Sequence, residues 1–256
     1  MDTPQPILFK VLVIGDACTD RYCYGDVTRL SPEAPVPILK HLYTEERPGM
    51  CLNVGANLEA FGVEVTILKN SEMLYKDRFV DTKTKQHLLR ADFGESEKVQ
   101  PPNKSDIAVN SYDAVVVSDY DKGFVSREIA EEISKQCRDS AIPLFVDSKK
   151  KDLTCYQNCF IKINEKEKKE LLAYSKSSDL IVTLGSRGAI WNQTLYSTHE
   201  CEVFDVSGAG DTFMASMVWK YLATKSMPES LKFANHCARI VVQKFGTYCL
   251  KKEDLE

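Results

Sequence analysis

Residues 7–16 read Ile-Leu-Phe-Lys-Val-Leu-Val-Ile-Gly-Asp, an apolar run that stops at Gly15 and Asp16. A run of this length that ends in a turn is typical of a buried strand. Four further runs resemble it, at residues 63–68, 113–118, 142–147 and 178–184. Together these runs predict the strands of one buried sheet.

Segments with helical periodicity lie between most of the predicted strands. Ile129, Ile133 and Cys137, for example, recur at i, i+4 and i+8. Strands that alternate with helices indicate right-handed βαβ units. We therefore expect an α/β fold, with a mainly parallel sheet flanked by helices, in a single domain over residues 1–256.

The carboxy-terminal part is expected to be helical. One apolar face begins near Gly210, and a second helix is predicted over residues 230–245. Pro228 suits a first helical turn, and Gly246 is placed to end the second helix.

Two regions interrupt the alternation of strands and helices. Residues 20–47 and 80–92 look like short strands outside the main sheet. They form either a small flap over the sheet edge or ordinary surface hairpins, and the residues alone leave both readings open.

Composition limits the possible functions. The chain has 256 residues, 43% of them hydrophobic, with 37 acidic and 33 basic side chains and a net charge of −4. This mildly acidic balance argues against a nucleic-acid partner. No apolar stretch approaches the roughly 18 residues of a spanning helix, so no membrane partner is expected. Residues 1–6 lack a basic region followed by an apolar one, so no secretory signal is expected. Nine cysteines without zinc-binding spacing indicate reduced thiols, as expected in the cytoplasm.

Residues 205–213, Asp-Val-Ser-Gly-Ala-Gly-Asp-Thr-Phe, carry the strongest chemical signal. Gly208, Ala209 and Gly210 allow a tight turn before a helix, whose first amides form an anion site suited to a transferred phosphoryl group. Asp211 then stands in the first turn, where a carboxylate can accept the proton of a substrate hydroxyl. The alternative is that Asp211 only caps the helix.

The segment 205–213 closely resembles the carboxy-terminal signature of the ribokinase-like (PfkB) sugar kinases, and the resemblance extends over nearly the whole chain. It implies an ATP-dependent carbohydrate kinase of ribokinase-like fold with Mg²⁺ as cofactor. By this resemblance, Asn164 and Glu167 form the family's Asn-x-x-Glu motif, in which Glu167 organises the metal through phosphate or water. The resemblance also implies five nucleotide contacts, from Asn164, Thr183, Gly185, Asn235 and Gly246.

The amino-terminal half resembles one branch, the heptose-7-phosphate kinase domain of bacterial ADP-heptose synthesis enzymes. The matching residues lie at 13–22, 28–37, 45–49, 89–93 and 118–123. The branch implies phosphorylation of the anomeric hydroxyl of a heptose 7-phosphate. It also implies that 20–47 and 80–92 form a β-lid that joins two subunits in a homodimer.

The branch also implies a set of substrate contacts. Asp20 is expected on the sugar hydroxyls, and Gly49 lies where the backbone approaches the sugar. Asp16 either touches substrate or caps the turn after the first strand, and Asn53 either binds sugar or caps a helix over residues 53–61. The substrate's distal phosphate has three candidate partners, which are otherwise solvated: Arg21, Arg90 and Lys122.

Several departures from the branch keep other readings open. Residues 49–53 read Gly-Met-Cys-Leu-Asn where relatives carry Gly-Gly-Ala-Ala-Asn, and Asp-Ser-Lys at 147–149 replaces Asp-Pro-Lys. The stretch between Leu68 and Lys85 is shorter than in relatives, which predicts a missing βα unit at the sheet edge. The nucleotidyltransferase half of the bifunctional enzymes in this branch is also expected to be absent. The alternatives are a kinase of the same fold for a different sugar and a non-catalytic ligand-binding relative.

Overall fold

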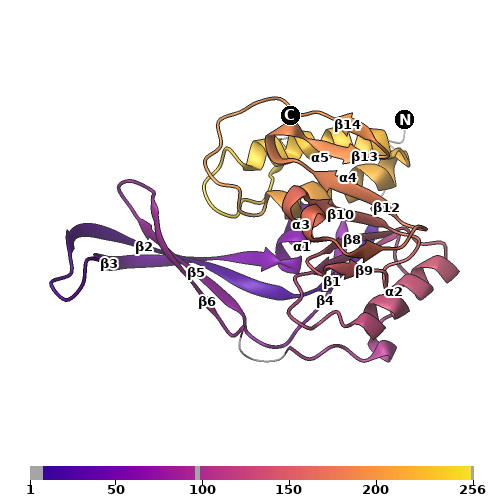
Figure 1. Cartoon of the computed structure of the whole chain (residues 1–256), viewed down its shortest axis with the longest axis horizontal. Coiled ribbons are helices and arrows are strands. Elements are labelled where there is room, and N and C mark those ends of the chain that lie inside the picture. The colour runs from indigo at the N-terminus through magenta and orange to yellow at the C-terminus, as the bar shows by residue number, and fades with distance from the viewer. Residues whose placement is uncertain (1–7, 96–98, 255–256) are drawn as a thin grey trace, which may run out of the picture.

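A computed structural model describes residues 8–95 and 99–254, so Ile7 of the expected first strand and the start of the chain at 1–6 lie outside the described residues. Its main sheet has eight strands in the order β14-β13-β12-β10-β8-β7-β1-β4 (Figure 1). Their bounds are β1 Lys10–Gly15, β4 Glu64–Lys69, β7 Ala114–Asp119, β8 Leu144–Ser148, β10 Phe160–Asn164, β12 Asp179–Thr183, β13 Ala189–Trp191 and β14 Thr194–Tyr196.

The pairings confirm the expected α/β fold. All neighbours from β4 to β12 pair in parallel, whereas β13 and β14 add an antiparallel edge. The four apolar runs after the first strand correspond to β4, β7, β8 and β12. The sequence did not predict β10, because Lys162 interrupts its apolar residues, nor the three-residue strands β13 and β14.

Helices cover both faces of the sheet. α1 (Cys51–Ala60), α4 (Ala209–Thr224) and α5 (Met227–Val241) share one apolar cluster with Val11 and Val13 of β1. α2 (Arg127–Asp139) packs on the opposite face, in a cluster that contains Leu12 and Ile14 (Figure 1). Alternate side chains of one buried strand therefore supply two cores.

Short elements complete the chain. They are the helix α3 (Glu165–Glu170), the strands β9 (Asp152–Leu153) and β11 (Ala173–Tyr174), and the 3₁₀ turns η1 (Lys104–Asp106), η2 (Gly185–Arg187) and η3 (Lys252–Asp254). Within the described ranges, we find no helix with the length and hydropathy that crossing a membrane requires.

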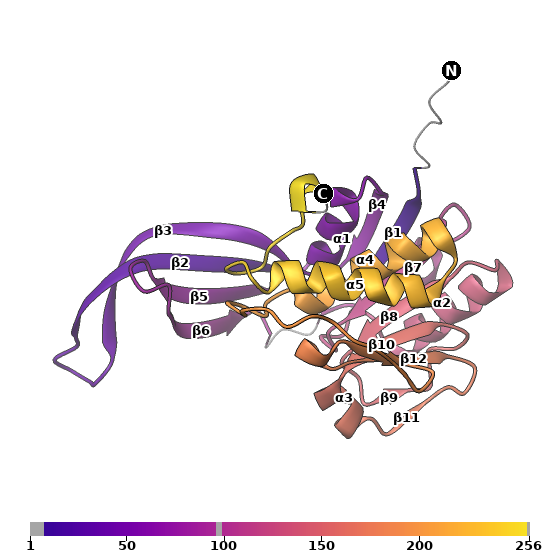
Figure 2. The same ribbon diagram turned by 90° about the horizontal axis from the view of Figure 1, so that it is seen from above.

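A second sheet of four strands projects to one side of the main sheet (Figures 1 and 2). It contains β2 (Ala17–Leu30), β3 (Pro37–Met50), β5 (Tyr75–Asp81) and β6 (His87–Phe93), in the order β3-β2-β5-β6. We call this sheet the lid. It includes much of residues 20–47 and 80–92, but β5 begins at Tyr75, earlier than the sequence indicated.

The chain enters the lid soon after β4. Only residues 70–74 separate β4 from β5, and β4 is the last strand at its edge of the main sheet. Three of its six side chains are half-buried and three are exposed. The arrangement agrees with the short stretch between Leu68 and Lys85 that the sequence indicated.

Two helix boundaries differ from expectation. α5 ends at Val241 rather than near residue 245, so Gly246 does not end it, although its φ of 73° is left-handed. α1 begins at Cys51 after Met50, so Asn53 lies in the first turn and is not the N-cap. Pro228 lies in the first turn of α5, as expected.

Candidate active site

Asp211 is the centre of the site. It lies in the first turn of α4, whose N-cap is Gly208, and its side chain is only 5% exposed. The amide of Asn53 donates to Asp211 Oδ2 at 2.9 Å, and the hydroxyl of Tyr120 donates to Oδ1 at 2.9 Å. Because Gly208 occupies the N-cap and these donors take both oxygens, the Asp211 carboxylate does not serve as the N-cap.

Burial controls the protonation of this carboxylate. Burial raises the pKa of Asp211 above its usual value, while the hydrogen bonds from Asn53 and Tyr120 oppose the rise. A carboxylate with a raised pKa is a stronger base than an ordinary one, which suits it to take a proton from an alcohol.

The helix start approaches its neighbours closely. Gly208 has a φ of 78°, and a Cβ there would lie 2.7 Å from the Asn53 amide nitrogen. A Cβ on Gly210 would lie 3.1 Å from the ammonium of Lys162. The amides of Gly210 and Asp211 belong to the first turn, where a helix offers no internal acceptor, so they can bind an anion.

A buried lysine faces the helix start. Lys162, 3% exposed, binds Asp147 Oδ2 at 2.5 Å and lies 3.4 Å from the carbonyl oxygen of Gly210. Burial opposes ionisation of Asp147, yet the ammoniums of Lys162 and Lys149 hold its pKa below the usual value. The sequence analysis did not identify Lys162 as a site residue, although a lysine inside an otherwise apolar strand was the available signal.

Asn164 and Glu167 hold each other at the start of α3. Asn164 Oδ1 accepts from the Glu167 amide and Glu167 Oε2 accepts from the Asn164 amide, each at 2.8 Å. The other oxygen of Glu167 binds the ammonium of Lys149 at 2.7 Å, and this ammonium also contacts Asp147 at 3.1 Å. The motif is therefore a capping box joined to the charged cluster.

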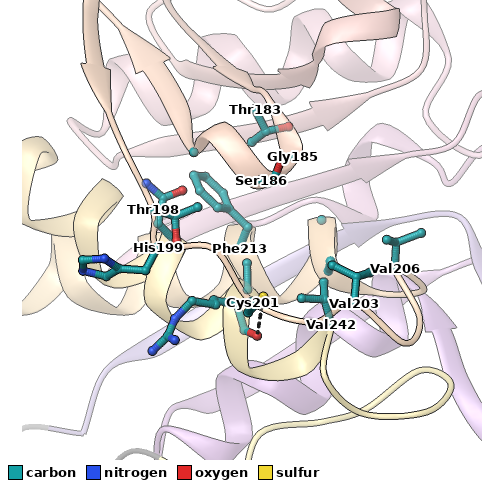
Figure 3. A pocket seen from close by; sticks show the side chains of 16 residues that line it. Thr183, Gly185, Ser186, Thr198, His199, Cys201, Val203, Val206, Phe213 and Val242 are labelled. Carbon is teal, nitrogen blue, oxygen red and sulfur yellow. Dashed lines mark hydrogen bonds between the residues drawn. The ribbon is translucent and has the colours of Figure 1, made fainter.

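Two cavities meet beside Asp211. The first, about 210 Å³, is mainly apolar and is lined by Val203, Val206, Phe213 and Val242, among others (Figure 3). The second, about 620 Å³, is lined by charged side chains and by the start of α4. The two share four lining residues: Thr183, Gly185, Val206 and Gly210. An apolar cavity that opens on a charged one suits the base and the phosphates of a nucleotide.

Four of the five expected nucleotide contacts line these cavities. Thr183 and Gly185 line both, Asn235 lines the apolar one and Asn164 the charged one. Gly246 lies instead against the lid, where a Cβ would meet a guanidinium nitrogen of Arg47 at 2.5 Å.

The expected sugar contacts fall into two groups. Asp20 and Gly49 lie together, because a Cβ on Gly49 would be 3.0 Å from Asp20 Oδ2. Asp20 is 5% exposed, binds the Arg78 guanidinium at 2.7 Å and accepts from the Thr247 hydroxyl at 2.9 Å. Asp16, fully buried, accepts three backbone amides of the turn 120–124.

Of the three phosphate candidates, Arg90 lines one of the cavities formed by the described residues. All three are paired with a carboxylate: Arg21 makes a two-point contact with Asp77 at 2.6 and 2.7 Å, Arg90 makes one with Asp92 at 2.7 and 2.6 Å, and Lys122 binds Glu95 at 2.7 Å. Arg90 lines a third cavity, of about 830 Å³, between the lid and the residues around 204–207 and 243–245. Its basic lining residues are Arg78, Lys85, His87 and Arg90. We call this space the basic lid cavity.

Met50 keeps a backbone conformation that glycine favours. Its φ is 56° and its ψ is −130°, and its side chain is 3% exposed. The side chain belongs to the apolar cluster that includes Cys18 and Leu74, and it lines none of the three cavities described here. The bulky substitution is therefore accommodated in the core.

Comparisons with known proteins agree with this geometry. The sequence pattern of the pfkB family of carbohydrate kinases matches residues 56–253. The bifunctional protein HldE of Sulfurimonas denitrificans is 31% identical over 303 aligned positions, which cover 96% of this chain and 63% of that protein. HldE of Pasteurella multocida is 32% identical over 301 positions, again 96% and 63%. The chain thus spans less than two thirds of the length of these relatives. Both alignments are longer than the 256 residues of this chain, so the relatives carry segments that this chain lacks.

Solved structures share the fold. A ribokinase of Arabidopsis thaliana, complexed with ribose and ATP, is 16% identical with a TM-score of 0.69, over 97% of this chain and 98% of that one. Phosphofructokinase-2 of Escherichia coli, in complex with potassium, is 15% identical with a TM-score of 0.75, over 96% and 97%.

Proposed function

Because the chain belongs to the pfkB family of ATP-dependent carbohydrate kinases, we propose that it phosphorylates the anomeric hydroxyl of a heptose 7-phosphate or a similar sugar phosphate. One observation carries the proposal: a buried carboxylate, Asp211, stands at the start of α4 beside a charged cavity that joins an apolar one. The names of the HldE relatives support the sugar class.

The chemical step follows from the geometry. Asp211 takes the proton of the attacking hydroxyl, and the hydroxyl oxygen forms a bond to the γ-phosphorus of ATP as the bond to the β-phosphate oxygen breaks. The amides of Gly210 and Asp211 stabilise the charge on the transferred group. Lys162, held by Asp147 beside Gly210, adds a fixed positive charge there.

A divalent metal fits this site only indirectly. Within residues 8–95 and 99–254, no cluster of three or more histidine, cysteine, aspartate or glutamate side chains offers a metal cage. Asn164 and Glu167 line the charged cavity, but both oxygens of Glu167 already have protein donors. Mg²⁺ bound to the phosphates would neutralise their charge, with Glu167 acting through water or phosphate.

We propose that the distal phosphate of the substrate binds in the basic lid cavity. Arg78 joins this cavity to Asp20, the residue proposed to contact the sugar. Arg90, Lys85 and His87 line the same space. Guanidinium groups bind phosphate oxygens through paired, charge-assisted hydrogen bonds, so a phosphorylated sugar gains affinity here over an unphosphorylated one.

A different sugar is the second candidate. The Asp20 carboxylate is engaged by Arg78 and Thr247, and relatives carry segments that this chain lacks. Both features change the surroundings of a bound sugar.

The lid and the cysteines carry two further proposals. Exposed Leu42, Leu89 and Phe93 on the lid support a homodimer formed through it. The nine cysteines are free, which supports a reducing, cytoplasmic location.

An ADP-release assay tests the proposed reaction. Purified protein, ATP and Mg²⁺ are mixed with heptose 7-phosphate, ribose, fructose and fructose 6-phosphate, each in turn. Heptose 7-phosphate is expected to give the highest kcat/KM, whereas preference for ribose or fructose overturns the sugar assignment. Asp211→Asn is expected to lose about 10²–10⁴-fold in kcat while still binding ATP. ATP binding without any sugar-dependent ADP release would favour a non-catalytic relative.

A further inference from the structure

One turn links Asp16 to the candidate base. The Asp16 carboxylate accepts the backbone amides of Tyr120, Lys122 and Phe124, at 2.7, 3.3 and 3.2 Å. These amides belong to the turn that directly follows β7, and Asp16 is fully buried. A single carboxylate therefore holds the backbone of residues 120–124 in one conformation.

The same turn brings a phenol to Asp211. The Tyr120 hydroxyl donates to Asp211 Oδ1 at 2.9 Å, while Asn53 donates to the other oxygen. The ring centroid of Tyr120 lies 5.1 Å from the ammonium of Lys76 and 5.3 Å from that of Lys149. Both cations lie within cation–π range and help to fix the ring.

We propose that Tyr120 is a positioning residue for Asp211, and that Asp16 acts through Tyr120 by holding the turn that aims the phenol. The inference rests on the proposed function, in which Asp211 is the base. An ionised carboxylate has about four acceptor positions. Tyr120 and Asn53 fill two of them, so the carboxylate is oriented and positions remain for the substrate hydroxyl.

The surroundings of Asp211 give Tyr120 a distinct electrostatic effect. The charged groups that face Asp211 are Asp147 of β8 and Lys162 of β10, and the thiols near it are Cys18, Cys51 and Cys249. Burial raises the pKa of Asp211, and the Tyr120 hydrogen bond lowers it. Burial and the nearby Asp211 raise the pKa of Tyr120 well above its usual value, so the phenol stays protonated and donates.

Tyr120→Phe tests the proposal, because it removes the donor and keeps the ring. With heptose 7-phosphate and ATP, the acid limb of the kcat/KM profile is expected to move up by about one pH unit, with about a 10-fold loss of activity below it. In the free enzyme, the ¹³C resonance of the Asp211 carboxyl, identified by its loss in Asp211→Asn, is expected to titrate at a correspondingly higher pH.

Tyr156→Phe is the matched control. Tyr156 is fully buried and its hydroxyl donates to another buried carboxylate, Asp119, at 2.7 Å. It is expected to leave the acid limb and the Asp211 resonance in place. If the Asp211 resonance titrates at the wild-type pH in Tyr120→Phe, or if Tyr156→Phe shifts that pH equally, the proposal is overturned.

Asp16→Asn tests the second part of the proposal, that Asp16 acts on Asp211 through Tyr120. It removes one acceptor oxygen from the turn and is expected to shift the Asp211 titration in the same direction but less. The double variant Asp16→Asn/Tyr120→Phe is expected to shift it no further than Tyr120→Phe alone, because both changes act through one hydrogen bond. Additive shifts would show that Asp16 does not act through Tyr120. If Asp211→Asn keeps normal turnover, the proposed base fails, whereas the resonance still reports on Tyr120.

Discussion

The side-chain amide of Asn53 lies 2.9 Å from Asp211 Oδ2, although 158 residues separate the two in sequence. Asn53 is in the first turn of α1, and α1 starts directly after the lid strand β3. The candidate base is therefore held by a helix that is continuous with the lid. A lid movement that shifts the start of α1 would also change the donor on Asp211.

Asp211→Asn is expected to change the pH dependence of stability. The pKa of Asp211 is raised by burial, so its contribution to stability is fully present below the ordinary carboxylate pKa and is lost as pH rises through the raised value. Asparagine stays neutral and escapes this loss. The free energy of unfolding of the variant, relative to wild type, is expected to improve from pH 4 to pH 8. The gain is about 1.4 kcal/mol for each pH unit by which folding raises the pKa of Asp211.

Asp147→Asn serves as the comparison of opposite sign. The pKa of Asp147 is lowered, because Lys162 and Lys149 outweigh its burial. Its stabilising contribution is present above the ordinary carboxylate pKa and is lost only as pH falls through the lowered value. We expect this variant to be destabilised at neutral pH, with a deficit that shrinks in acid. Parallel urea titrations of both variants check the two signs, and equal trends would contradict the assignment.

Lys162→Met is expected to reduce both stability and turnover. It leaves the buried Asp147 with Lys149 alone, and breaking a buried ion pair costs about 3–5 kcal/mol. It also removes the positive charge beside Gly210, and loss of one such group typically costs about 10²–10³-fold in kcat. Thermal unfolding and steady-state kinetics with varied ATP measure the two effects.

Lys150→Met separates the effect of Lys162→Met on stability from its effect on turnover. The Lys150 ammonium binds the buried Asp119 carboxylate at 2.6 Å, but Lys150 does not line the charged cavity. We expect a comparable loss of stability with kcat and the KM for ATP unchanged per folded molecule. A similar drop in kcat in both variants would assign the Lys162 effect to folding alone.

The sequence predicted the parts of this molecule that depend on neighbouring residues. Apolar runs located β1, β4, β7, β8 and β12, and the glycine-rich segment before Asp211 located the start of α4. Contacts between distant segments escaped it. Tyr120 reaches Asp211 across 91 residues, and Lys162 reaches Gly210 across 48. Such pairs depend on how strands are ordered in the sheet, which periodicity does not encode.

In the lid, too, the sequence predicted local strands but not the contacts between distant segments. Its strands were expected from two regions, but β5 pairs in parallel with β2 across more than 50 residues, and only that pairing brings Arg78 to Asp20. Of the three arginines and lysines proposed for the distal phosphate, the geometry assigns Arg90 alone to the basic lid cavity. The individual charges were visible in sequence, whereas their partners were not.

Arg90→Gln is expected to weaken binding of the phosphorylated sugar. A hydrogen bond between charged groups contributes about 1.5–3 kcal/mol, so the KM for the sugar phosphate should rise about 10-fold or more while the KM for ATP is unchanged. Lys83→Gln is the control, since Lys83 is an exposed lysine of the β5–β6 turn that does not line the cavity. Equal KM values in Arg90→Gln and wild type would remove the distal phosphate from this cavity.

At Met50 we expect the glycine variant to be more stable than the alanine variant, which reverses the usual order of stability. At a φ of 56° and a ψ of −130°, any side chain is strained, by about 1–3 kcal/mol, whereas glycine is not. Met50→Ala loses the burial of the methionine side chain and keeps the strain. Met50→Gly loses the same burial but relieves the strain. We therefore expect Met50→Gly to be more stable than Met50→Ala by about 1 kcal/mol or more in urea unfolding.

Val54 provides the matched comparison for this reversal. It is fully buried in α1, four residues after Met50, where the backbone is helical. Glycine in a helix costs about 1 kcal/mol relative to alanine, so Val54→Gly should be less stable than Val54→Ala. The difference in stability between the glycine and alanine variants is therefore expected to have opposite signs at residues 50 and 54. If Met50→Ala is instead the more stable of its pair, the backbone at residue 50 is unstrained, and the methionine does not carry the cost that we infer from its φ.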